Sequence, residues 1–133
     1  MYTRQIKWII YTVLVGLIPI ISRLFIWITT KAGTIDVLSP ADFIAFGLIL
    51  HISNINEIEH IDDVAPAWKT IQNGSSIIFI AFYSVLFALS LVGDAFIEKH
   101  ALLNCSITLS LVSLLLSCSV YYYLIKNERR ATP

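Results

Sequence analysis

The stretch ADFIAFGLILHISNINEIEHIDD (residues 41–63) begins like a membrane span and ends like an acidic soluble helix. Its apolar run, residues 43–50, lasts eight residues, whereas a helix rising about 1.5 Å per residue needs roughly 20 to cross the hydrocarbon core. Isoleucines recur beyond that run at spacings of mostly three and four, so the helix should continue. The sequence therefore predicts a second helix that leaves the bilayer and carries its acidic end into the cytoplasm.

The composition is that of a membrane protein. Of 133 residues, 57% are hydrophobic and 14% are charged, whereas soluble domains carry about 25% charged residues. Nine Lys and Arg balance nine Asp and Glu, so no overall field attracts nucleic acid. We therefore expect a single integral membrane domain over residues 1–133 that contacts lipid and does not bind nucleic acid directly.

The pattern of hydrophobic runs predicts an all-α fold, a four-helix transmembrane bundle. The expected spans are at about residues 6–28, 41–61, 75–96 and 101–125. Pro19 predicts a kink in the first span, and Ser39 with Pro40 is typical of a helix start. Asn73 and Gly74 form a turn signal, which places the start of the third span directly after them.

Four spans put both termini on the same side of the membrane. Placing that side in the cytoplasm brings six of the nine basic residues inside: Arg4, Lys7, Lys69, Lys126, Arg129 and Arg130. This arrangement satisfies the positive-inside rule. The chain is therefore predicted to be a multi-pass membrane protein with cytoplasmic termini and a cytoplasmic segment at residues 53–73.

The acidic end of the second helix has two interpretations. Its carboxylates belong to Glu57, Glu59, Asp62 and Asp63. They form either a solvated helix end or a docking surface for a cytoplasmic partner. Carboxylates near a helix C-terminus oppose the helix dipole, and anionic lipid repels them, so a basic partner would relieve both costs.

Polar residues follow directly after the apolar run of the second helix. Gly47, His51, Asn54 and Ile58 recur at spacings of four, three and four, so they share one helix face. Unsatisfied polar groups in hydrocarbon cost several kcal/mol. This face is therefore predicted to form either an interhelical contact or a pore lining.

Two further sets of residues are predicted to hold the spans together. Small residues that allow close helix approach are Ser106, Ser110, Ser113 and Ser117 on the fourth span, with Ala81, Ser84 and Ala88 as a counterpart on the third. Arg23 lies near the outer end of the first span, where insertion of an arginine is costly unless it is paired. Its expected partners on that side are Asp36, Asp42 and Asp94.

No pattern of catalytic or metal-binding residues accompanies these features. Cys105 and Cys118 are separated by about 20 Å on a helix, too far for a disulfide, and neither has CxxC or Cys/His spacing. The three histidines, His51, His60 and His100, fall in no serine or cysteine catalytic motif. We therefore expect no enzymatic activity, metal site or cofactor.

In layout, the chain resembles the membrane subunit of the bacterial Kiwa anti-phage system. The resemblance covers the small size, four spans, two short outer loops and an acidic inner helix, here SPADFIAFGLILHISNINEIEHIDD (residues 39–63). It implies a membrane homo-oligomer that senses infection at the envelope and works with a cytoplasmic, DNA-binding partner subunit. Glu57, Glu59, Asp62 and Asp63 would then contact that partner.

The leading hypothesis is thus a non-enzymatic inner-membrane protein that oligomerises and recruits a cytoplasmic protein. A small ion channel or membrane-permeabilising effector remains an alternative, in which His51 and Asn54 would line the pore. The layout is also similar to the immunity proteins of pore-forming bacteriocins, which would act through the spans and outer loops.

Overall fold

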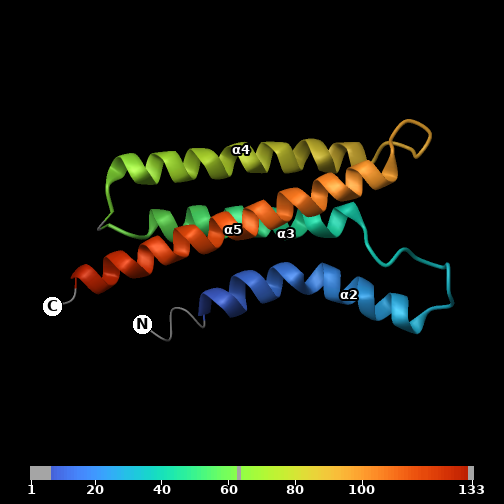
Figure 1. The fold of residues 1–133 in the computed structure, drawn as a ribbon, viewed down its shortest axis with the longest axis horizontal. Coiled ribbons are helices and arrows are strands. Elements are labelled where there is room, and N and C mark those ends of the chain that lie inside the picture. The colour runs from blue at the N-terminus through green and yellow to red at the C-terminus, as the bar shows by residue number, and fades with distance from the viewer. Residues whose placement is uncertain (1–6, 63, 132–133) are drawn as a thin grey trace.

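The computed structural model describes residues 7–62 and 64–131, and every regular element in this part of the chain is helical. A π-helical segment η1 runs directly into α2, and three further helices follow. The elements are η1 (Ile9–Leu14), α2 (Val15–Thr29), α3 (Pro40–Glu59), α4 (Pro66–Ser90) and α5 (Lys99–Ala131) (Figure 1). Counting η1 with α2, these are four helices, and the predicted all-α fold class is confirmed.

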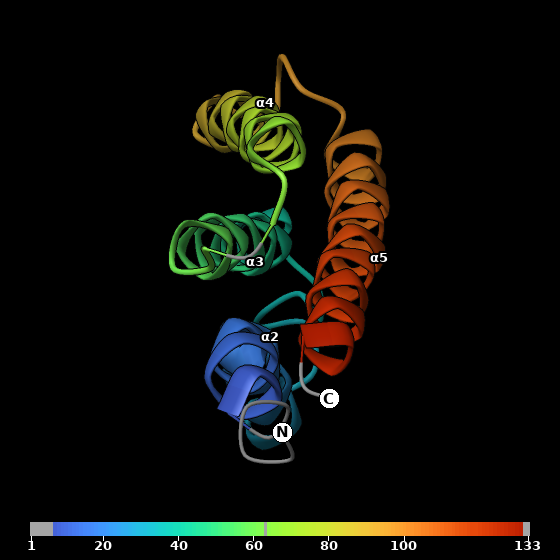
Figure 2. The same cartoon turned by 90° about the vertical axis from the view of Figure 1, so that its left-hand side faces the viewer.

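The helices form a layer of three with the fourth lying across it. Figure 2 shows α2, α3 and α4 in one row with α3 in the middle and α5 along one side. α5 packs on α3 and on α4. The connections 30–39 and 91–98 lie at one end of the bundle, called the loop end (Figure 1). The other end of the bundle, called the termini end, contains the turn at 60–65, the beginning of η1 and the end of α5.

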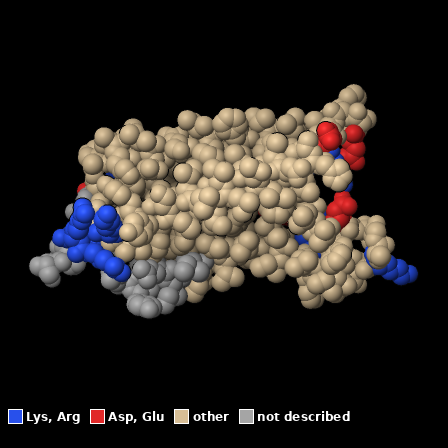
Figure 3. Space-filling model, viewed as in Figure 1, with Lys and Arg blue, Asp and Glu red and all other residues tan. Residues whose placement is uncertain are grey.

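Three of the described helical segments are long and apolar enough to cross a membrane. They are Ile10–Thr29, Pro66–Ser90 and Lys99–Asn127. On the face shown in Figure 3, charged side chains gather at the two ends, and a belt without them runs between. Large apolar side chains such as Phe25, Phe82 and Leu115 are exposed on these helices, as lipid contact requires.

α3 differs from these segments because it is the most enclosed helix. Eight of its 20 residues are buried, and at about 1.5 Å per residue its length of about 30 Å equals the hydrocarbon thickness. It runs as one continuous helix to Glu59, close to the predicted end at residue 61, and the chain then turns back into α4. Neighbouring helices cover one face of its second half, with Leu50, His51, Asn54 and Ile58 buried, whereas Ile52, Asn56 and Glu59 are exposed.

The boundaries of α4 and α5 also differ from the expected spans. Asn73 and Gly74 lie inside α4, which begins at Pro66, and the predicted turn there is wrong. Proline suits the first helical turn because it has no N–H to leave unbonded. α4 ends at Ser90 rather than near residue 96, and α5 continues to Ala131. Pro19 lies inside α2, and the irregular backbone is the π-helical segment just before that helix.

A hydrophobic cluster closes the termini end of the bundle. Ile58 and Val64 from the end of α3 and the turn pack against Val120 and Leu124 of α5. Aromatic pairs extend this contact: Trp68 stacks on Tyr123 with ring centroids 4.2 Å apart, and Trp8 stacks on Tyr121 at 4.6 Å. These contacts fix the turn at 60–65 against the last third of α5.

Ion pairs connect the segments at the loop end. Arg23 Nε donates to Asp42 Oδ2 between α2 and α3, and Lys99 Nζ donates to Asp36 Oδ2 at 2.6 Å. The Lys99 hydrogen bond and charge lower the pKa of Asp36, so this pair is charged at neutral pH. Asp94 is exposed, and its charge acts on Lys99. Of the three acids expected near Arg23, Asp42 forms the ion pair.

We expect Arg23→Leu to lower the free energy of unfolding by about 1–2 kcal/mol, because it leaves a largely buried Asp42 carboxylate without its cation. Thermal unfolding in detergent micelles measures the effect. The exchanged pair Arg23→Asp with Asp42→Arg should recover only part of the loss, since an arginine in the first turn of α3 opposes the helix dipole. Unchanged stability in Arg23→Leu would show that the pair contributes nothing.

Candidate functional site

Two polar side chains of α3 are buried at the centre of the bundle. His51 is 1% exposed and Asn54 is 3% exposed. His51 Nε2 lies 2.9 Å from Ser113 Oγ of α5, and His51 Nδ1 lies 3.3 Å from Ser76 Oγ of α4. Asn54 Nδ2 donates to Ser117 Oγ at 2.9 Å. α3 is therefore bonded through these two side chains to both α4 and α5.

Ser113 occupies the centre of this network, and its contacts determine the direction of each hydrogen bond. Ser113 Oγ donates its only proton to the Leu109 carbonyl oxygen at 2.8 Å. Tyr83 Oη lies 2.7 Å from Ser113 Oγ. A hydroxyl oxygen has two lone pairs, so it accepts from both Tyr83 O–H and His51 Nε2–H. Burial away from water favours the neutral imidazole, and in that form His51 Nδ1 accepts from the Ser76 hydroxyl, so both ring nitrogens are bonded.

Aromatic rings enclose the imidazole on the α4 side. His51 stacks on Phe79 with centroids 4.7 Å apart and planes inclined by 18°, and Tyr83 lies at 6.1 Å. Gly47 makes room for Tyr83, since a Cβ atom built there would come within 2.6 Å of Tyr83 Cε1. Tyr83 is 0% exposed, so its ring cannot move aside without opening the contact between α3 and α4.

The structure places the predicted polar face of α3 in an interhelical contact within one chain. Gly47, His51, Asn54 and Ile58 are all buried. Ile58 belongs to the hydrophobic cluster at the termini end, and the other three face α4 or α5. This burial favours the interhelical contact over the pore lining, because a pore between chains would need the same face to be open.

The serine stripe of α5 lies in the same contact. Ser106, Ser110, Ser113 and Ser117 are at most 2% exposed. Ser106 and Ser110 donate to carbonyls of their own helix, at Leu102 and Ile107, so their hydroxyls are satisfied without a second helix. Small side chains let helix backbones approach closely, and this stripe allows α5 to lie across α3 and α4.

The prediction that small residues of α4 form a packing counterpart to this serine stripe is wrong. Ala81, Ser84 and Ala88 are exposed, and Ser84 Oγ donates to the Ile80 carbonyl of its own helix. At 100° per residue these three lie 100–160° around the helix from Tyr83, which faces the core. α4 is oriented by its polar and aromatic residues rather than by its smallest ones.

Several members of the network were not foreseen from the sequence. Ser76 and Tyr83 lie seven residues apart and therefore share a helix face, a signal that could have identified the inner face of α4. Thr12 Oγ1 lies 2.7 Å from Ser53 Oγ and links the first helix to α3. A threonine in an apolar span is ordinary, so the sequence gives little reason to select it.

No family model, curated protein or solved structure matches this chain. Its chemistry must therefore be judged from its own side chains. His51 beside Ser113 has the residue types of a base and a nucleophile, but the Ser113 proton goes to the Leu109 carbonyl and both side chains are at most 1% exposed. A substrate cannot reach them, and the arrangement acts as a structural network.

The acidic residues occupy the exposed corner of the termini end. Glu59 and Asp62 are exposed, and Glu57 is half-buried. Asp63 lies outside the described residues. Glu59 Oε1 accepts from Asn73 Nδ2 at 2.6 Å, which ties the last turn of α3 to α4. The acidic corner in the described part of the chain thus comprises Glu57, Glu59 and Asp62.

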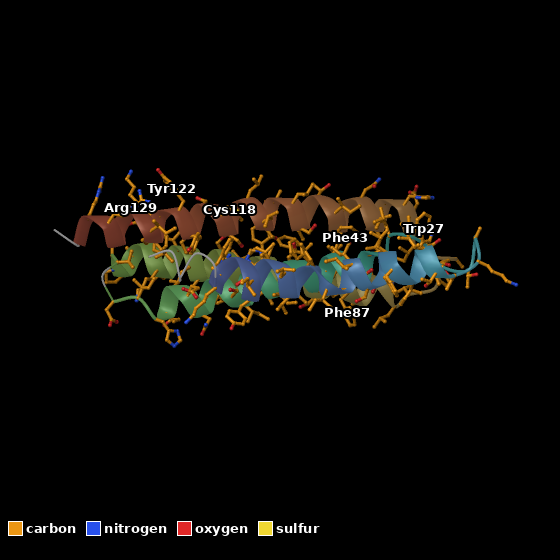
Figure 4. All side chains as sticks on the ribbon, turned by 90° about the horizontal axis from the view of Figure 1, so that it is seen from below. Trp27, Phe43, Phe87, Cys118, Tyr122 and Arg129 are labelled. Carbon is orange, nitrogen blue, oxygen red and sulfur yellow. The ribbon has the colours of Figure 1, made fainter. Side chains whose placement is uncertain are left out.

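Basic residues gather at the same end, on α5. Lys126, Arg129 and Arg130 lie on its last turns and are exposed, and Figure 3 shows a blue group there. Tyr122 and Arg129 point away from the other helices (Figure 4). The termini end therefore presents a face of mixed charge, acidic on the turn and basic on α5.

Proposed function

We propose that this chain is a non-enzymatic protein of the bacterial inner membrane whose termini end binds a soluble protein partner. The observation that carries the proposal is the separation of surface chemistry along the bundle. The middle shows no charged side chain in the view of Figure 3. The termini end carries the exposed Glu59 and Asp62 where α3 ends, and exposed basic residues on the last turns of α5.

The termini end has the rigidity that a docking surface needs. The cluster of Ile58, Val64, Val120 and Leu124 holds the acidic turn against α5. α5 has 33 residues, a length of about 50 Å, whereas the hydrocarbon core takes about 30 Å. Roughly three of its turns are thus available outside the bilayer, and they carry the basic residues toward a partner. A fixed surface loses little conformational entropy on binding.

The layout that resembles the Kiwa membrane subunit supports a more specific form of this proposal. In that form the chain is the membrane component of an anti-phage complex, it assembles as a homo-oligomer, and its soluble partner is a DNA-binding subunit. The termini would then be cytoplasmic, as the basic residues on α5 favour.

The test is co-purification with the product of the gene that is co-transcribed with this one. We expect the double variant Glu59→Lys with Asp62→Lys to reduce recovery of that protein about tenfold or more, because like charges across an interface cost several kcal/mol. The matched control, Asp94→Lys with Glu98→Lys, reverses two exposed acids at the loop end and should leave recovery unchanged.

Membrane insertion and thermal stability of both variants should match the wild-type protein. Asp62→Lys alone leaves the bond between Asn73 and Glu59 intact, so it separates loss of docking from a disturbed turn. Equal recovery of the partner with the wild-type protein and with all variants would contradict the proposal.

A further inference from the structure

A groove of about 450 Å³ lies between the second half of α4 and the first three turns of α5. Because α5 begins beside α4 and ends near α2 (Figure 2), this groove lies toward the loop end of the bundle. Phe82 and Val85 of α4 line it together with Asn104, Cys105 and Thr108 of α5. All five side chains are exposed. The groove, called the α4–α5 groove, therefore opens on the outer surface of the bundle.

Two polar side chains of this groove belong to the membrane-spanning part of α5. Asn104 and Thr108 lie in the apolar segment Lys99–Asn127. Tyr122, near the other end of that segment, is exposed, and exposed tyrosines are typical of the head-group level. The hydrocarbon core takes about 20 residues of helix, so it reaches from Tyr122 back to about residue 102. Asn104 and Thr108 therefore lie at a depth where lipid tails, rather than water, surround the protein.

The bundle itself gives these two side chains no hydrogen bond. Neither Asn104 nor Thr108 has a side-chain partner within residues 7–62 and 64–131. At 100° per residue each lies 160° around α5 from Ser106, on the side away from the packed serine stripe. A threonine hydroxyl has the backbone of its own helix as an acceptor, whereas an amide in hydrocarbon needs a partner outside the helix, and lipid tails offer none. Asn104 is therefore a polar group whose partner this chain does not supply.

A second copy of this chain supplies a partner for Asn104 at the required depth. Copies that insert in the same orientation form a symmetric pair about an axis parallel to the membrane normal, so each residue near the axis meets its own counterpart at the same depth. An asparagine amide has both an NH₂ donor and a carbonyl acceptor. Two Asn104 side chains are therefore complementary to each other, a match that a lipid tail lacks.

We propose that the α4–α5 groove is the contact between two copies of this chain in the membrane, with the two Asn104 amides bonded to each other across a twofold axis. Thr108 lies one turn further along α5 beside the same axis, and the second copy covers Phe82 and Val85. This inference rests on the membrane location in the proposed function and identifies the surface through which the chain associates with itself. It leaves the termini end of both copies open to a soluble partner.

The test is the association of full-length protein, labelled at its N-terminus with a donor or an acceptor dye, in phosphatidylcholine vesicles. Energy transfer is followed as lipid is added. We expect the wild-type protein to form dimers and Asn104→Leu to weaken the association about five- to tenfold, the range for two reciprocal hydrogen bonds between membrane helices. Asn104→Gln keeps an amide and should retain most of the association. The matched control, Ser22→Leu, replaces an exposed polar residue of α2 and should leave the association unchanged.

Cross-linking in membranes locates the contact on α5. In a chain with Cys105→Ser and Cys118→Ser, the substitution Thr108→Cys should give a disulfide-linked dimer on oxidation with copper phenanthroline, because this position lies beside the axis. The control is Cys105→Ser alone. It keeps the exposed Cys118, which lies about 15 Å further along α5 and 80° around it from Thr108, so this protein should remain monomeric on oxidation.

Thermal unfolding in detergent separates the contact from the fold. Asn104→Leu should be as stable as the wild-type protein, because it only exchanges a lipid-facing amide for an apolar side chain. Three results overturn the proposal: a monomeric wild-type protein in vesicles, equal association of the wild-type protein and Asn104→Leu, or cross-linking through Cys118 instead of Thr108→Cys. Extraction of the protein from membranes by carbonate would contradict the membrane location and thus both proposals, whereas an integral but monomeric protein overturns only the dimer.

Discussion

Gly47→Leu is expected to lower the free energy of unfolding by about 3 kcal/mol or more, because the new side chain must occupy the space of the Tyr83 ring. Its Cβ alone would lie 2.6 Å from Tyr83 Cε1, closer than any ordinary contact. Inserting a side chain into a packed core typically costs about 1–3 kcal/mol. The cost is at the upper end here because the Tyr83 hydroxyl is bound to Ser113 and cannot follow the ring outward without breaking that bond.

The matched control for this prediction is Gly74→Leu on α4, where a built Cβ meets nothing within 4 Å. That variant should be at least as stable as the wild-type protein, because leucine favours a helix more than glycine does. Gly47→Ala should lower the free energy of unfolding less in a Tyr83→Leu protein than in the wild-type protein. A double-mutant cycle measures this coupling between the two residues. If Gly47→Leu and Gly74→Leu were equally stable in thermal unfolding, this result would contradict the close packing of α3 against α4 at Gly47 and Tyr83.

The helical fold was readable from the sequence because three hydrophobic runs are long enough to cross a bilayer, and because isoleucines recur at spacings of mostly three and four in the second segment. The same periodicity placed Gly47, His51, Asn54 and Ile58 on one face of the second helix, and all four are buried. Periodicity gives the face of a helix but not the neighbour that covers it. The position of α3 between α2 and α4, under α5, depends on contacts such as those of His51 with Ser76 and Ser113, which are remote in sequence.

The failed predictions have a common physical cause, since local signals were overruled by distant contacts. Asn73 and Gly74 have the chemistry of a turn, yet Asn73 lies in a helix where it bonds to Glu59, while Trp68 stacks on Tyr123. The polar residues after the apolar run of α3 have two different surroundings. His51 and Asn54 bond to α5, which is the interhelical contact that was one of the two predicted alternatives, whereas Glu59 and Asp62 are exposed. Hydropathy alone cannot distinguish a wet helix from one that other helices shield.

The buried network leads to the second large effect, in His51→Leu, which we expect to lower the free energy of unfolding by about 2 kcal/mol. The variant loses two hydrogen bonds and the stack on Phe79; side-chain hydrogen bonds between membrane helices average about 0.6 kcal/mol, and aromatic stacks add about 0.5–1.5. The double variant His51→Leu with Ser113→Ala should lose less free energy of unfolding than the sum of the two single losses, because both substitutions remove the same hydrogen bond. Additive losses in thermal unfolding would mean that His51 and Ser113 do not interact. That result would contradict the hydrogen bond from His51 Nε2 to Ser113 Oγ.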